Sequence, residues 1–224
     1  MLKRVIEVSP FQANCWIVAC ENTAEAVVID PGDEVGHIFA ELEDIEKSLS
    51  KKLHVKYILL THAHVDHVGA AGELKRKIAA TGVQAGKQDE GLAKIALNKD
   101  DELLYINIKR QADMFGLKCE DPLPIDHYLK DNEELAVGDL RVTVLFTPGH
   151  SPGGVCFKIN STVFTGDTLF CGSVGRTDIL GGDTKAMFRS IRGRLLSLDD
   201  DTLVCPGHGP ETTIGEERQQ NPFL

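Results

Sequence analysis

The stretch THAHVDH at residues 61–67 follows the apolar run YILL and places three histidines and one aspartate within seven positions. We predict a buried strand for the apolar run and a turn for the stretch after it. In an extended chain His62 and His64 point to the same face, because side chains alternate with a period of two. Asp66 and His67 follow one turn later and are placed to reach a second position. Neutral imidazoles and carboxylates are common ligands of divalent ions, so the stretch predicts a metal site.

Three other segments repeat this pattern of an apolar strand followed by a turn that carries His or Asp. The runs VTVLF, VFT and TLVC lead into turns that contain His150, Asp167 and His208, respectively. A loop beyond a strand end can aim its side chain into a shared cleft, so the four turns predict one site. Asp167, alone in its turn, is the natural shared ligand. The candidate ligands are too many for one tetrahedral zinc and suit two ions: His62, His64, Asp66, His67, His150, Asp167 and His208.

The remaining sequence predicts two groups of short strands with helices beside them. Because neighbouring strands mostly form hairpins, a purely parallel sheet is disfavoured. We predict an α+β fold with two mixed β-sheets packed together and helices on the outer faces, in a single domain over residues 1–224. The expected strands are Arg4–Val8, Cys15–Cys20, Ala26–Asp30, Tyr57–Leu60, Glu134–Val137, Leu140–Phe146, Val155–Ile159, Thr162–Thr165 and Thr202–Cys205. The expected helices are Val35–Leu49, Val68–Ala80 and Thr184–Leu196, with residues 88–116 helical or irregular and Gly215–Gln220 a turn or a helix.

The composition argues against several classes of protein. The 224 residues carry 24 Lys and Arg against 34 Asp and Glu, a formal net charge of −10, which disfavours binding to nucleic acid or to an anionic membrane surface. No apolar run approaches the roughly 20 residues that span a bilayer, and the first residues do not resemble a signal peptide. The six cysteines have no CxxC spacing and are expected to be reduced thiols. The cytoplasm is the expected location.

Seven motifs resemble, in order, those of the metallo-β-lactamase superfamily: FQANCWIV, VIDPG, THAHVDHVGA, TPGHSPGG, FTGDTLF, GSVGRTD and PGHGP. The sequence is most similar to the glyoxalase II-like (hydroxyacylglutathione hydrolase-like) branch, and within it to compact bacterial members. The resemblance implies an αββα sandwich, which agrees with the fold predicted above. The ligand sets that it implies are His62, His64 and His150 for one metal and Asp66, His67 and His208 for the other, with Asp167 as the bridge.

The resemblance implies hydrolysis of a thioester, S-D-lactoylglutathione or a related acyl-glutathione, by a hydroxide that bridges two divalent metal ions. Zinc is the expected metal, with iron or manganese as alternatives. Asp66 is the predicted catalytic residue, because its carboxylate can orient the hydroxide. Arg176 is the predicted substrate-binding residue, since an arginine fork suits a carboxylate. The alternative for Arg176 is a structural pair with Asp178.

Two departures from the branch bear on the substrate. The sequence ends 16 residues after His208, so we expect that the C-terminal helical domain that binds glutathione in glyoxalase II is missing. Pro210 stands where that family has a tyrosine. The resemblance to this branch therefore supports thioester hydrolysis by this protein better than it supports specificity for glutathione.

Three other functions stay open. The run Gly175–Asp178 is also similar to the persulfide (sulfur) dioxygenases of the same superfamily, which use a mononuclear iron. A lactonase or β-lactamase-like hydrolase of esters or amides would use the same ligands. A metal-binding protein without catalysis is the third. The expected partner is a small-molecule substrate, with no nucleic acid and no membrane, and the sequence does not indicate the oligomeric state.

The other candidate residues are interpreted as structural. His37 is expected to face solvent on a helix, His54 to lie in a basic connection and His127 to lie in a loop. Cys171 is expected to be a small buried side chain rather than a ligand or a nucleophile. Met114-Phe115 precedes a glycine and could cover the cleft, but packing in the core is the expected role.

Overall fold

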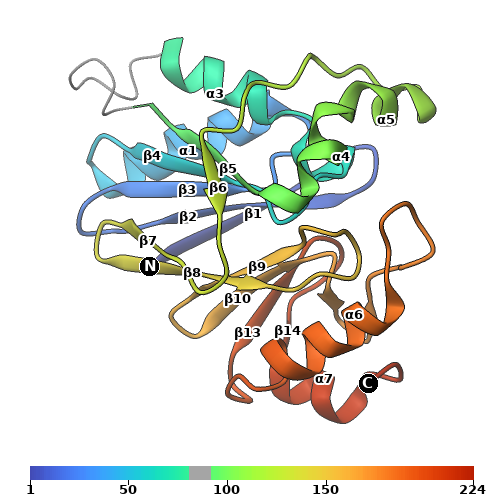
Figure 1. Ribbon diagram of the computed structural model, residues 1–224. Helices are drawn as coiled ribbons and strands as arrows, with labels where there is room; N and C mark the ends of the chain where they lie inside the picture. Colours follow the sequence, from blue (N-terminus) through green and yellow to red (C-terminus); the bar gives the residue numbers. More distant parts are fainter. Residues whose placement is uncertain (81–91) are drawn as a thin grey trace.

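Two β-sheets lie face to face in the computed structural model, which describes residues 1–80 and 92–224. Helices cover the outer side of each sheet, so the molecule has four layers (Figure 1). Each sheet contains both parallel and antiparallel pairs, and the predicted αββα fold is therefore confirmed. Among the described residues, every helix is too short or too polar to cross a membrane.

The described strands of the first sheet lie side by side in chain order. The first three pair antiparallel and the last four pair parallel, with helices as the crossovers between parallel neighbours. Its strands are β1 (Leu2–Val8), β2 (Ala13–Ala19), β3 (Glu25–Ile29), β4 (His54–Leu59), β5 (Lys94–Asn98) and β6 (His127–Leu129). The helical segments of this half are α1 (Val35–Leu49), α2 (Val65–Val68), α3 (Ala71–Ala80), η1 (Lys99–Asp101), α4 (Glu102–Ile106) and α5 (Ile108–Met114).

The second sheet has the order β14-β13-β10-β9-β8-β7 among the described strands. Both predicted hairpins are confirmed, and Gly138 and Asn160 supply the positive φ angles of their turns. The strands are β7 (Glu134–Val137), β8 (Leu140–Phe146), β9 (Val155–Ile159), β10 (Thr162–Gly166), β13 (Leu203–Pro206) and β14 (Thr212–Thr213), with a separate small hairpin of β11 (Leu169–Phe170) and β12 (Ser173–Val174). The helical segments are α6 (Thr184–Ser190), η2 (Ile191–Leu195) and α7 (Ile214–Gln220).

Three hydrophobic clusters join the four layers. In β3, Val27 and Ile29 face the opposite sheet, whereas Ala26 and Val28 face the helices of their own half. Both faces of this strand are buried, which explains its nearly continuous apolar sequence. A third cluster lies between the second sheet and the helices of the C-terminal half. The sheets are thus fixed against each other, and the loops at the ends of their strands have rigid supports.

One predicted segment differs from the structure because a short buried strand lies within it. Residues 88–116 were expected to be helical or irregular, and residues 88–91 lie outside the described part of the chain. The described part begins with β5, which pairs parallel with β4 and β6, and only then continues into helices. A fully buried strand has no alternating pattern, so its sequence cannot be told from a buried helical turn by periodicity.

The helix expected at Val68–Ala80 is interrupted in the structure. It consists of α2 and α3, separated by Gly69 and Ala70. A Cβ atom on Gly69 would lie 2.5 Å from the backbone oxygen of Gly32, and the backbone N–H of Ala70 donates to the backbone oxygen of Pro31 at 3.0 Å. The chain bends here because the loop after β3 comes against it.

Candidate metal centre

The candidate ligands stand at the ends of strands from both sheets. Residues 61–67 follow β4 of the first sheet, and His150, Asp167 and His208 follow β8, β10 and β13 of the second. The backbone N–H of Val155 donates to the backbone oxygen of Thr61 at 2.8 Å, which holds the two sheets together beside these loops. All seven predicted ligands therefore meet in one cluster.

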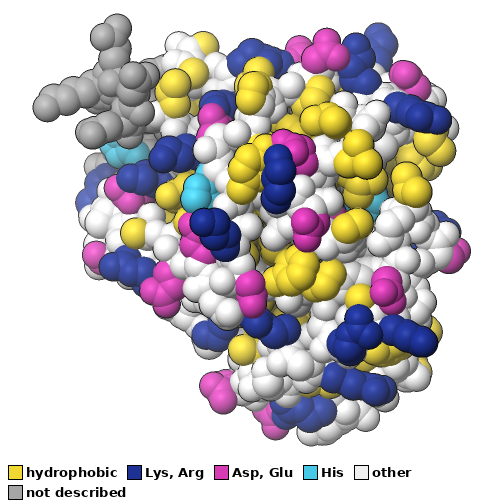
Figure 2. Space-filling view, viewed as in Figure 1, with side chains coloured by type: hydrophobic (Ala, Val, Ile, Leu, Met, Phe, Trp, Pro, Cys, Tyr) yellow, Lys and Arg dark blue, Asp and Glu magenta, His cyan; other side chains and the backbone are white. Residues whose placement is uncertain are grey.

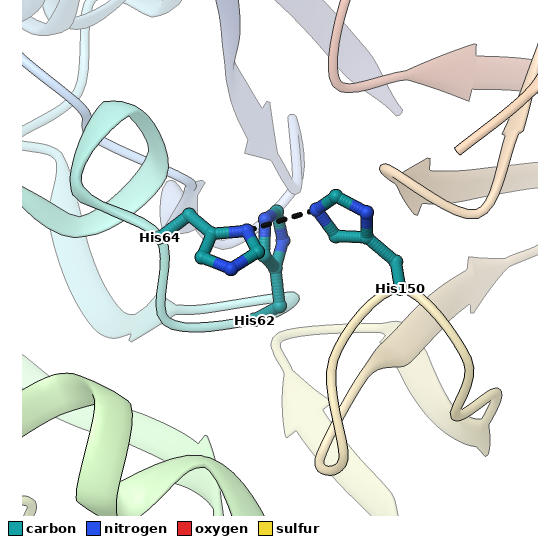
Figure 3. A group of neighbouring side chains, drawn as sticks. All are labelled: His62, His64 and His150. Atoms are coloured by element: carbon teal, nitrogen blue, oxygen red, sulfur yellow. Dashed lines mark hydrogen bonds between the residues drawn. The ribbon is translucent and has the colours of Figure 1, made fainter. Parts of the chain in front are cut away.

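His62, His64 and His150 form what we term the three-histidine group. Their side chains point toward one another from two loops (Figure 3). Nδ1 of His64 lies 2.8 Å from Nε2 of His150, and one ligand atom from each residue lies within 4.8 Å of the others. Three nitrogen donors at this spacing suit one ion of the zinc type.

Asp66, His67 and His208 form what we term the mixed group. Oδ2 of Asp66 lies 3.3 Å from Nε2 of His208 and 3.6 Å from Nε2 of His67, and the two Nε2 atoms are 3.2 Å apart. This group combines a carboxylate with two imidazoles, a donor set that zinc, iron and manganese all accept. Asp66 and His67 lie on α2, whose first turn directs both side chains into the cluster.

Asp167 stands between the two groups. Its Oδ1 lies 3.3 Å from Nε2 of His67 and 3.7 Å from Nε2 of His208. Its Oδ2 lies 3.5 Å from Nε2 of His150. One carboxylate oxygen thus faces the mixed group and the other faces the three-histidine group, which is the position of a shared ligand.

Two buried atoms show that the cluster fits a cation. Nε2 of His62 and Oδ1 of Asp167 make no hydrogen bond with any described residue. Buried polar atoms without partners are rare because desolvation is costly, and both belong to side chains inside the cluster. Gly207 keeps the centre compact, since a Cβ there would lie 2.4 Å from Oδ1 of Asp167 and 2.7 Å from Cε1 of His67.

Hydrogen bonds from outside the cluster orient the imidazoles. Nδ1 of His67 lies 3.2 Å from Oδ2 of Asp30, and Nδ1 of His150 lies 2.8 Å from the backbone oxygen of Arg176. These oxygens only accept, so each Nδ1–H donates and Nε2 is the ring atom that faces the cluster. Partners of this kind fix the tautomer that a metal requires. Two more imidazoles have the same arrangement: His62 with Oγ1 of Thr61, and His208 with the backbone oxygen of Gln12.

The two groups differ in their electrostatics. Burial and the neighbouring imidazoles lower the pKa of His64 to about 4, and burial also lowers the pKa of His62 well below its usual value. Burial has the same tendency at His67, but the charges of Asp167 and Asp66 outweigh it and raise the pKa of that imidazole well above its usual value. His62 and His64 are therefore neutral at pH 7, whereas His67 in the mixed group holds a proton.

The carboxylates of the cluster are ionised. Burial tends to raise the pKa of both Asp66 and Asp167, but the nearby imidazoles outweigh it and hold both values below the usual range. At His208 burial is outweighed in turn by the hydrogen bond to Asp66 and the charge of Asp167, so its pKa is raised. A cation that enters the mixed group must displace these protons.

Asp30, which we did not predict as a site residue, holds two of the imidazoles. It accepts hydrogen bonds from the backbone N–H and the hydroxyl of Thr61, at 2.8 and 2.6 Å, and from Nδ1 of His67. Thr61 in turn holds His62. Asp30 follows the apolar strand β3 directly, so the pattern of a strand followed by an acidic turn could have identified it.

Asp101, also missed from the sequence, ties together the two loops of the three-histidine group. Its Oδ2 accepts from the backbone N–H of Ala63 at 2.9 Å and from the hydroxyl of Ser151 at 2.8 Å. Its Oδ1 accepts from the backbone N–H of Gly153 at 2.5 Å. Ala63 lies between the first two histidines and Ser151 follows the third. The same pattern would have identified Asp101 if β5, three residues earlier, had been predicted.

Arg176 forms the pair that was its structural alternative. Its Nε and Nη2 lie 2.8 and 3.0 Å from the carboxylate oxygens of Asp178, and both side chains are exposed. The backbone oxygen of Arg176 holds His150. Its predicted role in substrate binding stays a prediction.

The predicted burial of Cys171 is wrong. All six cysteines lie in the described residues and are free, and the Cys171 thiol is exposed because it forms the tip of the β11–β12 hairpin with Gly172. His37 is exposed, as predicted. His54 and His127 are not in connections, since they begin β4 and β6, and neither belongs to a described cluster that could hold a metal.

The core packing expected for Met114-Phe115 is also wrong. The side chains are 76% and 58% exposed. The ring of Phe115 packs edge to face against that of Phe11, with centroids 5.1 Å apart. The pair ends α5 on the surface of the molecule.

Known proteins share both the fold and the sequence pattern. A family model described as the metallo-beta-lactamase superfamily matches residues 8–208. The chain is 37% identical over 223 residues to hydroxyacylglutathione hydrolase GloC of Haemophilus influenzae, which covers 98% of this chain and 96% of that protein. The crystal structure of BLEG-1 B3 metallo-beta-lactamase matches with a TM-score of 0.85 and 32% identity, over 100% of this chain and 99% of that one. The crystal structure of TTHA1623 in a di-iron-bound form matches with a TM-score of 0.81 and 38% identity, over 99% and 100%.

Proposed function

The chain belongs to the metallo-β-lactamase superfamily, as a metallohydrolase, and from that premise we propose that it hydrolyses a thioester, S-D-lactoylglutathione or a related acyl-glutathione. The observation that carries the proposal is the position of Asp167, with one oxygen toward each ligand group. A cluster of this form suits two ions around a shared carboxylate, the arrangement of dinuclear hydrolases. The identity of 37% to a hydroxyacylglutathione hydrolase supports the thioester.

In this proposal the three-histidine group would hold one ion and the mixed group the other, with Asp167 as a ligand of both. When bound, the ions supply a water that is deprotonated near neutral pH and a positive charge that stabilises the developing oxyanion. Zinc is the proposed metal because imidazole and carboxylate suit it. The di-iron form of TTHA1623 supports iron as the alternative.

The protein's own groups would hold and orient the reactants. Asp66 is ionised at neutral pH and can accept a hydrogen bond from the attacking water, which is the catalytic role proposed for it. Asp30 and Asp101 are positioning residues, because they fix the loops and imidazoles without reaching the substrate. Arg176 is proposed to leave Asp178 and bind a substrate carboxylate, which an arginine fork can do with two hydrogen bonds.

Hydrolysis of a β-lactam or another amide or ester is a second candidate. The observation in its favour is the match to BLEG-1, a B3 metallo-beta-lactamase, over the full length of this chain. The two candidates need the same metal cluster and differ only in the leaving group. A thiolate can leave without a proton, whereas an amine must gain one, so the thioester makes the smaller demand on a cluster whose imidazoles would all be metal ligands.

The test is elemental analysis of the purified protein, followed by assays of S-D-lactoylglutathione and a cephalosporin on the same sample. We expect close to two metal equivalents and faster hydrolysis of the thioester. A higher kcat/KM for the β-lactam would overturn the proposal. The proposed partner is a small molecule, and the proposed location is the cytoplasm.

A further inference from the structure

An apolar groove of about 700 Å³ lies beside the metal cluster. It runs between α4 and α5 on one side and the loop of residues 177–183 on the other. Figure 2 shows hydrophobic side chains gathered around α4 and α5. Leu103, Met114 and Leu180 line the groove and are 71%, 76% and 83% exposed. Large apolar side chains that gather at one hollow of the surface mark a site of binding.

The loop that carries Leu180 is held in place. The hydroxyls of Thr177 and Thr184 lie 2.7 Å apart, and the backbone N–H of Asp183 donates to the backbone oxygen of Gly149 at 2.8 Å. A Cβ on Gly181 would lie 2.8 Å from Cδ of Pro152, so the loop packs closely against the wall of the groove. Leu180 is therefore presented to solvent by a fixed backbone.

The groove borders the two loops that carry the three-histidine group. Gln111 lines it, and its Nε2 donates to the backbone oxygen of Ala63 at 3.0 Å. Its Oε1 accepts from the backbone N–H of Val65 at 3.1 Å. These two backbone groups flank His64 in the chain. On the other side Pro152, also in the lining, lies two residues after His150. The groove thus lies against both loops of the three-histidine group.

A second cavity beside the cluster is lined by both charged and apolar side chains. It measures about 230 Å³ and touches Asp66, on the side of the mixed group. Its lining includes the carboxylates of Asp33, Glu73 and Glu120 and the ammonium of Lys118. An apolar chain there would remove charged groups from water without compensation. The groove, in which apolar side chains dominate, therefore suits the apolar part of a substrate better than this cavity does.

From this arrangement we infer that the groove binds the acyl chain of the substrate, and that among the acyl-glutathiones proposed above those with extended apolar acyl groups are better substrates than the short, hydroxylated lactoyl compound. The inference rests on the proposed function, because it takes the thioester carbon to lie at the metal cluster. The groove volume is in the range of sites that enclose small ligands.

The test uses S-alkylglutathione thioethers, which contain no carbonyl and cannot be hydrolysed. Binding of the methyl, butyl, hexyl and octyl compounds to the metal-loaded protein is measured by calorimetry. Burial of each methylene should lower the dissociation constant about fourfold until the groove is filled. Leu180→Ser and Met114→Ser should weaken this dependence on chain length. Phe223→Ser, which removes another exposed apolar side chain outside the groove, should leave this dependence unchanged.

Two results would overturn the inference. One is an affinity that does not change from methyl to octyl. The other is a concentration-dependent dimer that Leu180→Ser dissociates, with no effect of chain length, because the groove would then be an interface between two copies of the chain.

Hydrolysis assays separate this inference from the proposed function. If the unmodified protein cleaves octanoylglutathione with a higher kcat/KM than acetylglutathione, and Leu180→Ser and Met114→Ser remove this preference, the proposed function and the groove are both supported. If affinity grows with chain length but neither thioester is cleaved, the groove is supported and thioester hydrolysis is rejected. If both are cleaved equally well, the hydrolase is supported and the groove is rejected.

Discussion

The three-histidine group offers a cation three nitrogens and no carboxylate, whereas the mixed group offers a carboxylate with two imidazoles. Without a metal, the pKa of His64 is lowered to about 4, while that of His67 is raised. His62 and His64 of the first group are thus neutral, whereas the second group must release protons when it binds a cation. One cluster of similar side chains thus contains two sites with different responses to pH. Asp167 is the residue that joins them.

Removal of the shared carboxylate should have the largest effect, because it acts on both groups. We expect Asp167→Ala to lower hydrolysis by more than the ~10–100-fold typical of residues that only orient ligands. Metal content by elemental analysis should fall in parallel. Unchanged metal content together with retained turnover would show that Asp167 is not a ligand of either ion.

His208→Ala tests whether the mixed group is needed at all. In a dinuclear hydrolase the variant should lose one metal equivalent and most of its activity. A mononuclear iron enzyme that consumes oxygen with a persulfide would depend less on His208 than on His62, His150 or Asp167. Oxygen uptake with a persulfide by the His208→Ala variant would therefore favour the dioxygenase.

Asp101→Asn should affect the three-histidine group selectively. The amide can accept fewer hydrogen bonds from Ala63, Ser151 and Gly153, so the two loops would separate. We expect metal affinity and activity to fall by ~10–100-fold. The matched control is Asp100→Asn, which changes an exposed neighbour.

Thermal unfolding of the Asp101→Asn variant distinguishes displacement of the two loops from destabilisation of the whole fold. Burial raises the pKa of Asp101, so its charge lowers stability once the pH rises through that value. Removal of the charge should offset part of the lost hydrogen bonding, and the melting temperature should change little. A large fall in melting temperature would mean that Asp101 acts on the whole fold.

Titration with zinc at several pH values should separate the two groups by their protons. His67 and His208 have raised pKa values. For each proton that the ion in the mixed group displaces, its affinity should therefore fall about tenfold with each pH unit by which the solution is made more acidic. Calorimetry in two buffers of different ionisation enthalpy measures those protons directly. The first equivalent of zinc should release fewer protons than the second. Equal release would contradict the difference in protonation between the two groups.

The same protons determine the stability of the metal-free protein. A pKa raised by folding contributes stability at low pH, and the contribution is lost as pH rises through the raised value. His67 therefore favours the metal-free fold in acid, whereas His64, with a lowered pKa, opposes it as pH falls from about 6.5 toward about 4.

The smallest effect is expected at Arg176, outside both groups. If the guanidinium binds a substrate carboxylate, Arg176→Ala should raise KM severalfold and leave kcat and metal content unchanged. Asp178→Ala frees the same guanidinium and should not raise KM. Equal kinetics for the two variants would assign the pair a structural role only.

The seven candidate ligands could be predicted because each stands next to an apolar run that forms a strand. The information is local, and the pattern of strand and turn carries it. The same holds for the two mixed sheets, whose hairpins depend on turns such as those at Gly138 and Asn160. That one domain comprises residues 1–224 stays a prediction.

The rest depended on contacts between distant segments. Asp101 acts through Ser151 and Gly153, some 50 positions later, and no local pattern indicates that pairing. Cys171 was expected to be a small buried side chain because the set of ligands was complete without it, but the hairpin turn points it outward. Met114-Phe115 would suit a core by composition alone, and only the position of α5 at the surface shows that it does not.

The ligands of the mixed group come from different sheets, since His67 follows β4 and His208 follows β13. A cation held there would act as a cross-link between two layers that otherwise adhere through apolar side chains and a few hydrogen bonds, such as those from Nδ2 of Asn14 to the backbone oxygens of Pro206 and Gly209. Unfolding would have to release the ion, so its presence at 100 times the dissociation constant would add about 2.7 kcal/mol to stability. The melting curve of the protein would then report how much metal the surrounding solution supplies.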